Sequence, residues 1–242
     1  MKNFILNTEI TFTDYDTLFR LIYDNAEQRK KFTVAYANSY LCNYVLKHDM
    51  LNDCLSKFDL VHADGIGVHL ASKFLYRQKE HWERVNGTDL YFKLLSDERK
   101  TGFFILGGPE KTVELLEGKF GDKVYGFIYQ ITDNENDIDT INKSGADILL
   151  VALGTPEQET WIIKNKDKIN VPVIIAVGSG IDYLTGRKKR APLIMRKTGL
   201  EWFFRLIQEP LRLWKRYLII NPVFIFKIVR QKVNLLTKTV NT

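Results

Sequence analysis

The stretch that decides the fold spans residues 149–159 and reads L-L-V-A-L-G-T-P-E-Q-E. Its apolar first half is typical of a parallel strand that is covered on both faces. The strand ends at Gly154, and we expect Thr155 to cap a helix that begins at Pro156, with Gln158 as the reciprocal capping side chain. Such a helix start lies at the carboxyl edge of a sheet, where α/β proteins bind ligands. Simple helix capping explains the same residues equally well, so other parts of the chain must decide.

The same alternation of apolar strands and polar helical segments recurs along the chain before the tail. We expect a short strand or hairpin arm at residues 5–12 and parallel strands at residues 31–37, 60–63, 103–106, 124–129, 146–153 and 171–177. Helices are expected between them, including residues 14–31, 40–48, 66–76, 90–96 and 133–143, and an exposed loop at residues 77–84. This order predicts an α/β fold, a Rossmann-like mainly parallel sheet with helices on both faces.

The C-terminal tail differs in composition from the rest of the chain. Of the 35 Lys and Arg residues, 14 lie between residues 187 and 242 together with only two of the 29 acidic residues, so this part carries +12 and the remainder −6. Three prolines are expected to divide the tail into short helical pieces: Pro192, Pro210 and Pro222. Aromatic residues lie among the cations, which is typical of a segment at an anionic membrane surface. We predict a core over residues 1–191 and a basic amphipathic membrane-docking appendage over residues 192–242.

Length and composition exclude several classes of protein. With 242 residues, 45% of them hydrophobic, the chain can bury one substantial core and is not a disordered chain. Its two cysteines, Cys42 and Cys54, have no metal-ligand spacing and suit a reducing cytoplasm. Neither a secretion signal nor an uninterrupted apolar run of about 18 residues is visible, so we expect no membrane-spanning helix.

Glycine follows three of the expected strands, at Gly107 and Gly108, at Gly154, and at Gly178 and Gly180. Glycine at a strand end lets the backbone approach a phosphate group closely. Each position alone is more often a simple turn, and the dinucleotide fingerprint G-x-G-x-x-G is absent from the sequence. Three such ends at one edge of a sheet favour a nucleotide or nucleotide-sugar ligand.

Asp64 follows the strand at residues 60–63 in the stretch A-D-G-I-G. A carboxylate at a strand end can accept a proton from an attacking hydroxyl group, although an Asp-Gly turn is an equally simple explanation. Two D-x-D triplets, at residues 14–16 and 137–139, lie at expected helix starts and are interpreted as caps. The sequence therefore predicts no metal site and no cofactor.

Several arginines are candidates for binding a diphosphate. The planar guanidinium of Arg84 suits phosphate oxygens, although a solvated surface arginine is the ordinary alternative. In the tail, Arg205, Arg212 and Lys215 are spaced seven and three residues apart. They share one helix face if the helix continues through Pro210.

These motifs together resemble one protein family. The matching stretches are A-D-G-I-G (63–67), E-R-V-N-G-T-D-L (83–90), L-G-T-P-E-Q-E (153–159), V-G-S-G-I-D-Y-L-T-G-R-K-K-R-A-P (177–192) and G-L-E-W-F-F-R-L-I-Q-E-P-L-R-L-W-K-R-Y (199–217). They resemble the WecG/TagA/CpsF family of bacterial glycosyltransferases. The resemblance covers most of the chain, and the last two stretches are the most specific.

The resemblance implies an inverting, metal-independent transfer of a hexose or N-acetylhexosamine, with N-acetylmannosamine favoured. The donor would be a UDP-sugar and the acceptor a polyprenyl-pyrophosphate-linked sugar, in surface polysaccharide or teichoic acid assembly at the inner face of the cell membrane. By position, Asp64 resembles the family's catalytic base. The residues that resemble its substrate-binding positions are Asn38, Arg84 and Gln158 in the core and Arg205, Arg212 and Lys215 in the tail. The predicted substrate-binding set also includes Asn86, the glycines named above, Thr155 and Asp182.

The chain departs from the family pattern at Tyr36, where threonine is common two residues before the asparagine. Lys215 replaces a frequent arginine, and residues 179–182 vary a usual Gly-Gly-x-Phe-Asp pattern. The change at Tyr36 lies near the sugar pocket, so UDP-glucose or UDP-uronic acid transfer stays an alternative. A non-catalytic nucleotide-binding or nucleic-acid-binding protein is the rival class, but such a module has no need for the Asp64 carboxylate. We therefore expect no nucleic acid partner, and the sequence leaves homo-oligomer formation open.

Overall fold

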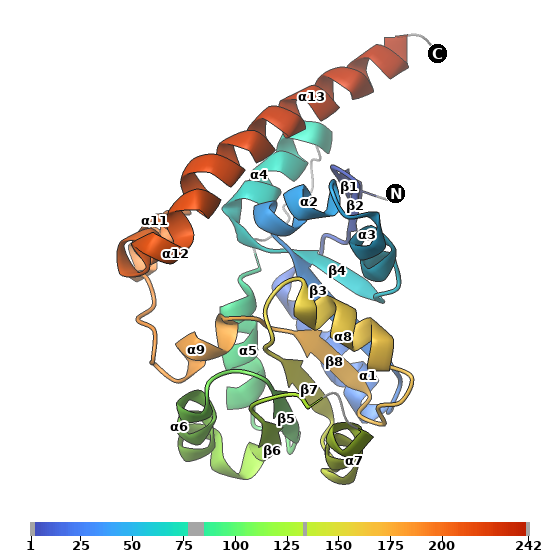
Figure 1. The fold of residues 1–242 in the computed structure, drawn as a ribbon, viewed down its shortest axis with the longest axis vertical. Coiled ribbons are helices and arrows are strands. Elements are labelled where there is room, and N and C mark those ends of the chain that lie inside the picture. The colour runs from blue at the N-terminus through green and yellow to red at the C-terminus, as the bar shows by residue number, and fades with distance from the viewer. Residues whose placement is uncertain (1–2, 77–84, 133–134, 241–242) are drawn as a thin grey trace.

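The computed structural model of the chain describes residues 3–76, 85–132 and 135–240 (Figure 1). A six-stranded parallel sheet forms the centre, in the order β4-β3-β8-β7-β5-β6. Its strands are β3 (Phe32–Ala37), β4 (Leu60–Ala63), β5 (Phe103–Leu106), β6 (Val124–Ile128), β7 (Ile148–Val151) and β8 (Val173–Ala176). A separate antiparallel hairpin pairs β1 (Asn3–Ile5) with β2 (Thr8–Ile10). The predicted parallel α/β fold is confirmed.

Helices connect the strands and cover both faces of the sheet. Those of the first 186 residues are α1 (Tyr15–Glu27), α2 (Ser39–Val45), α3 (Asp49–Ser56), α4 (Gly65–Tyr76), α5 (Gly87–Ser96), α6 (Glu110–Phe120) with the 3-10 turn Gly121–Lys123, α7 (Glu135–Lys143), α8 (Glu157–Asn165) and α9 (Gly180–Leu184). Those of the tail are α10 (Leu193–Lys197), α11 (Glu201–Gln208), α12 (Pro210–Trp214), the π-helical segment Lys215–Ile220 and α13 (Asn221–Val240). The sequence did not predict α3 as a separate helix.

The alternation of side chains along β7 shows why the sheet is buried on both faces. Leu149 and Val151 lie in one hydrophobic cluster with α2, α3, α4, α7, α8 and α13. Ile148 and Leu150 point to the opposite face and pack with α1, α5, α6 and α9. Two apolar faces on one strand require two layers of helices, which is the arrangement of a doubly wound sheet.

The tail differs from the sequence prediction at Pro222. Pro210 does begin a new helix, but Pro222 lies in the first turn of the 20-residue helix α13 and does not divide the tail. The π-helical segment comes immediately before it, and the N–H of Asn221 bonds to the carbonyl of Arg216. Because this wider turn replaces the ordinary i→i−4 bonding pattern, a proline that cannot donate such a bond is accommodated there.

Helix α13 is attached to the core along its first half and projects beyond it at its C-terminal end (Figure 1). Phe224 and Ile228 are buried in the cluster that includes α2 and α4. On the hairpin side, the Gln231 side chain donates to the carbonyl of Phe4 and accepts from the N–H of Leu6, at 2.8 and 2.9 Å. One face of this helix is therefore part of the core.

Candidate active site

Two adjoining cavities lie at the carboxyl edge of the sheet. The first, here called the polar cleft, has a volume of about 550 Å³ and lies between the loops after β3, β4, β7 and β8 and the tail segment 205–220. The second, the apolar pocket, has a volume of about 390 Å³ and lies between α4, the start of α11 and the start of α13. Five residues line both cavities: Asn38, Asp64, Asn86, Arg205 and Arg216. Both volumes are typical of small-molecule binding sites.

The polar cleft brings together most of the residues that the sequence singled out. These are Asn38, Asp64, Asn86, Gly154, Thr155, Gln158, Gly178, Gly180, Arg205, Arg212 and Lys215. Gly107, Gly108 and Asp182 line neither of the two cavities. Arg84 lies outside the described residues, as does the whole loop predicted at residues 77–84.

Asp64 lies where the two cavities meet. It follows β4 directly, and its backbone N–H donates to the carbonyl of Ala37 at the end of β3, at 2.8 Å. Gly65 then turns the chain into α4 with a positive φ of 81°, a conformation that glycine adopts without strain. The two strand ends thus fix the backbone of Asp64, and its side chain is half-buried between the cavities.

Asn38 and Asn86 each begin a helix. The Oδ1 atom of Asn38 accepts from the N–H of Leu41 at 3.1 Å, and Oδ1 of Asn86 accepts from the N–H of Thr88 at 2.9 Å. Both side chains therefore act as N-caps and also line the two cavities. Nδ2 of Asn86 donates to Oε2 of Glu201 at 2.8 Å, which ties α5 to the tail helix α11.

The β7–α8 loop has a different construction from the predicted capping box. Helix α8 begins at Glu157, its N-cap position is Pro156, and no side chain caps it. Pro156 therefore precedes the first helical position and does not occupy it. Oε1 of Gln158 instead accepts from the N–H of Gly178 at 2.9 Å and joins the β7 loop to the β8 loop. The capping prediction was wrong because the amide oxygen of Gln158 bonds to the distant β8 loop, while its nitrogen bonds to the side chains of Thr155 and Glu159 and not to a backbone group at the helix start.

Glu159 lies directly behind this connection, and sequence reasoning missed it. Its side chain is 0% exposed, and its Oε1 accepts from Nε2 of Gln158 at 2.7 Å and from Oγ1 of Thr155 at 3.1 Å. Burial raises the pKa of Glu159 from 4.5 to about 7. A glutamate in the first turn of a helix is ordinarily solvent-exposed, so no signal in the sequence distinguishes it.

The tail places its cations over the cleft by a turn rather than along one helix face. Glu209, with φ −133° and ψ 60°, separates α11 from α12. Arg205 therefore lies on one helix, Arg212 on the next, and Lys215 at the start of the π-helical segment. All three line the polar cleft together with Arg216, which the sequence analysis did not single out.

Arg205 is a partly buried cation that pairs with the tail helix it belongs to. Its Nη2 contacts Oε1 of Glu201 at 2.6 Å, and its guanidinium lies 4.7 Å from the centre of the Tyr183 ring. Burial lowers the pKa of Arg205, but Glu201 and other nearby acidic groups, including Asp64, outweigh it and raise the pKa overall. The guanidinium is therefore a permanent positive charge beside Asp64.

Aromatic side chains form the floor of the cleft. The rings of Tyr36 and Tyr91 meet edge to face with centroids 5.8 Å apart, and both line the cleft. Burial, followed by other effects that include the Asp64 charge, raises the pKa of both phenols, so they stay protonated at neutral pH. Besides these two, Tyr40, Gly87 and Thr88 line the cleft and were not predicted as site residues.

An α/β sheet whose carboxyl edge holds a carboxylate facing several fixed cations is suited to group transfer from an anionic donor. The chain matches the model of the glycosyl transferase WecG/TagA/CpsF family over residues 4–238, and it belongs to that family. The chain is a glycosyltransferase by this membership, and the resemblance inferred from its motifs is confirmed.

Two curated relatives are each 28% identical to this chain over most of its length. The N-acetylglucosaminyldiphosphoundecaprenol N-acetyl-beta-D-mannosaminyltransferase of Staphylococcus aureus (strain MW2) is 28% identical over 209 residues, which cover 82% of this chain and 80% of the relative. The enzyme of the same name from Bacillus spizizenii (strain ATCC 23059 / NRRL B-14472 / W23) is 28% identical over 240 residues, which cover 96% of this chain and 87% of the relative.

Proposed function

We propose that the chain is an inverting, metal-independent glycosyltransferase. It moves a hexose or N-acetylhexosamine, N-acetylmannosamine in the first instance, from a UDP-sugar to a sugar on a polyprenyl pyrophosphate. The observation that carries the proposal is the place of Asp64, at the junction of a polar, cation-lined cleft and an apolar pocket. The names of the two relatives support the choice of sugar and of lipid-linked acceptor.

Asp64 acts as the general base in this proposal. Its carboxylate takes the proton from the acceptor hydroxyl while the hydroxyl oxygen attacks the anomeric carbon of the donor sugar. The bond between that carbon and the β-phosphate oxygen breaks, and UDP leaves with the electron pair. Because the attack comes from the face opposite the leaving group, a single displacement inverts the anomeric configuration.

The tail cations stabilise the leaving UDP. Arg205, Arg212, Lys215 and Arg216 line the polar cleft across from the glycine-bearing loops. Fixed positive charges aimed at oxygens that gain negative charge lower the barrier for diphosphate departure. These four side chains take the role that a divalent cation has in other nucleotide-sugar enzymes.

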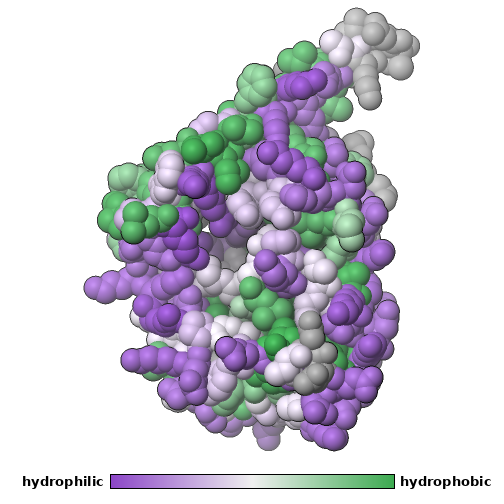
Figure 2. Space-filling view, viewed as in Figure 1, coloured by the Kyte–Doolittle hydropathy of each residue, from purple (hydrophilic) through white to green (hydrophobic). Residues whose placement is uncertain are grey.

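The apolar pocket and the tail surface receive the lipid-linked acceptor. Ile66, Leu70, Phe224 and Ile225 line the apolar pocket, which opens between α4 and α13. Apolar side chains also gather outside it over the tail helices from α11 to α13 (Figure 2), among them Ile207, Leu211, Phe226 and, in the π-helical segment, Leu218. None of the helices in the described ranges is long and apolar enough to cross a membrane. In this proposal, the apolar and basic side chains of the tail dock the enzyme on the inner face of the membrane.

A donor screen tests this proposal. The full-length chain is incubated with UDP-N-acetylmannosamine, UDP-N-acetylglucosamine, UDP-glucose or UDP-glucuronic acid and a short-chain polyprenyl-pyrophosphate-N-acetylglucosamine acceptor. Release of UDP and the mass of the product are both measured, with Asp64→Asn as the blank. We expect acceptor-dependent product with UDP-N-acetylmannosamine. Product with only UDP-glucose or only UDP-glucuronic acid would replace UDP-N-acetylmannosamine as the proposed donor. The absence of product with every donor would contradict the proposal.

A further inference from the structure

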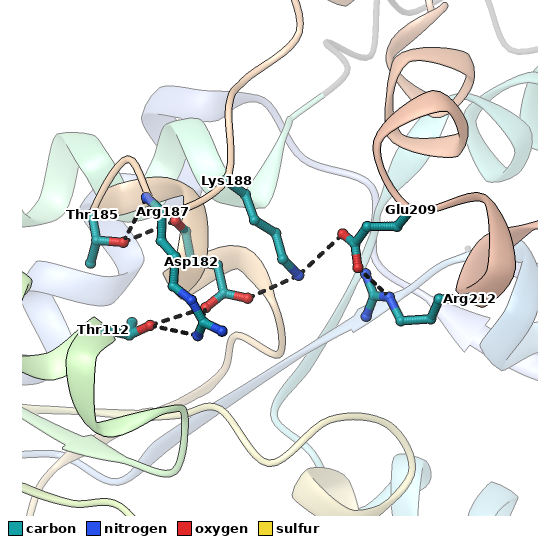
Figure 3. Close-up of polar contacts among 7 residues, drawn as sticks. All are labelled: Thr112, Asp182, Thr185, Arg187, Lys188, Glu209 and Arg212. Carbon is teal, nitrogen blue, oxygen red and sulfur yellow. Dashed lines mark hydrogen bonds and ion pairs between the residues drawn. The ribbon is translucent and has the colours of Figure 1, made fainter.

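The basic run Arg187-Lys188-Lys189-Arg190 makes more contacts within the protein than its position in a basic tail suggests. Nη1 of Arg187 lies 3.4 Å from Oδ1 of Asp182 and donates to Oγ1 of Thr112 at 3.2 Å (Figure 3). Nη1 of Arg190 pairs with Asp89 on helix α5. The run therefore connects the core to the tail through ion pairs.

Lys188 lies at the centre of this connection. Its Nζ atom contacts two carboxylates at once, Oδ2 of Asp182 at 2.9 Å and Oε1 of Glu209 at 3.2 Å (Figure 3). Asp182 belongs to the core helix α9, whereas Glu209 is the residue that separates α11 from α12. The three side chains are mostly shielded from solvent, with exposed fractions of 20%, 10% and 24% for Lys188, Asp182 and Glu209. Shielding of this kind strengthens an ion pair relative to one on an open surface.

The second oxygen of Glu209 continues the chain of contacts into the polar cleft. Oε2 of Glu209 lies 2.5 Å from Nε of Arg212, and Arg212 lines the cleft. With Nε taken, the Nη1 and Nη2 atoms of Arg212 keep their donors for another anion. An arginine that is held at Nε before its ligand arrives loses less conformational freedom when the ligand binds.

We propose that Lys188 is a positioning residue for the diphosphate of the donor, acting through Glu209 on Arg212. Lys188 holds Glu209 against the core, and Glu209 directs the terminal nitrogens of Arg212 into the cleft. This inference rests on the proposed use of a UDP-sugar. Lys188 lines neither cavity, so it would act on donor binding only through Glu209 and Arg212.

Calorimetric titration of the full-length chain with UDP tests the inference. Lys188→Gln should weaken UDP binding about fivefold, within the range of about two- to thirtyfold that substitutions in a coupling network produce. Arg187→Gln is the matched control, because it removes the same charge from the same Asp182 without touching Glu209; binding should stay within about twofold. Lys188→Arg, which can keep both ion pairs, should bind UDP nearly as tightly as the unaltered chain.

A double-mutant cycle separates positioning from a general effect on the fold. In an Arg212→Ala background, Lys188→Gln should have no further effect on UDP affinity, because the residue through which it acts is gone. Glu209→Gln removes the other partner of the Lys188–Glu209 ion pair. Adding Lys188→Gln to this variant should likewise change UDP affinity little. If Lys188→Gln weakens UDP binding as much in the Arg212→Ala background as in the unaltered chain, the inference is overturned while the proposed function stands. The same holds if Lys188→Gln does not weaken UDP binding in the unaltered chain. If the unaltered chain does not bind UDP, both are overturned.

Discussion

The two walls of the polar cleft are built in opposite ways. On the sheet side, the buried Gln158 accepts a hydrogen bond of 2.9 Å from the β8 loop at Gly178 and donates one of 2.7 Å to the buried Glu159. On the tail side, Arg212 remains 54% exposed and is held by an ion pair with Glu209. Buried hydrogen bonds are little affected by salt, whereas partly exposed ion pairs weaken as ionic strength rises.

This difference indicates a division of work between the walls. The sheet side is fixed by the fold itself and carries Asp64, which under the proposed mechanism must meet the reacting atoms in one geometry. The tail side contributes charge through side chains that ion pairs, rather than buried hydrogen bonds, hold in place. Substitutions on the sheet side should therefore act mainly on rate, and substitutions on the tail side mainly on the binding of UDP.

The largest expected effect comes from Asp64→Asn. We expect the rate of transfer at saturating substrates to fall about 10²- to 10⁴-fold, the usual loss when a general base is removed. The affinity for the UDP-sugar should stay nearly the same, since asparagine has the same shape and the backbone bond to Ala37 is kept. Steady-state kinetics and calorimetric titration measure the two quantities. A variant that turns over at the unaltered rate would remove Asp64 from the catalytic role.

The second prediction concerns helix α13 of the tail, which has one face buried in the core and one face exposed. Phe224 is 2% exposed and Phe226 is 70% exposed, although both lie on α13 two residues apart. Phe224→Ala should lower the free energy of unfolding by about 3–5 kcal/mol, the usual cost of removing a buried phenylalanine. Phe226→Ala should leave stability within about 0.5 kcal/mol but reduce sedimentation with anionic vesicles.

Denaturant unfolding and vesicle sedimentation of the two variants, side by side, separate the core face of α13 from its docking face. Equal losses of stability would show that α13 is packed on both faces. Unchanged vesicle binding by Phe226→Ala would assign membrane docking to other side chains of the tail.

The sheet was predictable from the sequence because its strands are short apolar runs with clear ends. The strands at residues 60–63 and 103–106 have the predicted bounds, since Asp64-Gly65 and Gly107-Gly108 end them. The same local signals placed Asp64, Gly154 and Gly178 at one edge of the sheet. Where a residue's position depends on its own strand or turn, the pattern of the sequence was sufficient.

The remaining features depend on contacts between distant parts of the chain. Gln158 bonds to Gly178, and Lys188 bonds to Glu209, in each case about 20 residues away. Gly107 looked like a phosphate-binding glycine, but a Cβ there would lie 2.7 Å from the Leu153 side chain, so close packing accounts for it. Hydropathy and spacing do not register such contacts, and they do not show that Glu159 is buried.

The third prediction concerns the buried carboxyl group of the sheet side. Because the pKa of Glu159 is raised to about 7 in the folded chain, the folded state holds a proton between pH 4.5 and 7 that the unfolded state releases. The contribution of Glu159 to stability is therefore complete below pH 4.5 and is lost as the pH rises to about 7, by up to about 3 kcal/mol. His62, whose pKa burial lowers to about 4, contributes with the opposite sign over nearly the same range.

Because Glu159 and His62 change stability with pH in opposite directions, the stability of the unaltered chain alone does not isolate Glu159. The difference in stability between a Glu159 variant and the unaltered chain does. In denaturant unfolding, we compare the free energy of unfolding of Glu159→Gln with that of the unaltered chain. The difference should favour the variant more at pH 7.5 than at pH 5. The control Glu157→Gln changes an exposed glutamate two residues away, and its difference from the unaltered chain should not depend on pH in this way. A flat difference between pH 5 and pH 7.5 for Glu159→Gln would mean that this carboxyl group titrates in its ordinary range.

The smallest expected effect is that of a chelator, and it tests the tail side directly. Under the proposed mechanism the charge of the leaving UDP faces Arg205, Arg212, Lys215 and Arg216, so EDTA should change the rate of transfer by less than about twofold. The rate should be insensitive to added Mg²⁺ in the same assay, while Arg212→Ala should weaken UDP binding whether or not Mg²⁺ is present. Loss of transfer in EDTA, with recovery on adding Mg²⁺ or Mn²⁺, would contradict this assignment. The tail would then serve only to dock the enzyme, and the difference between the two walls would no longer concern the diphosphate.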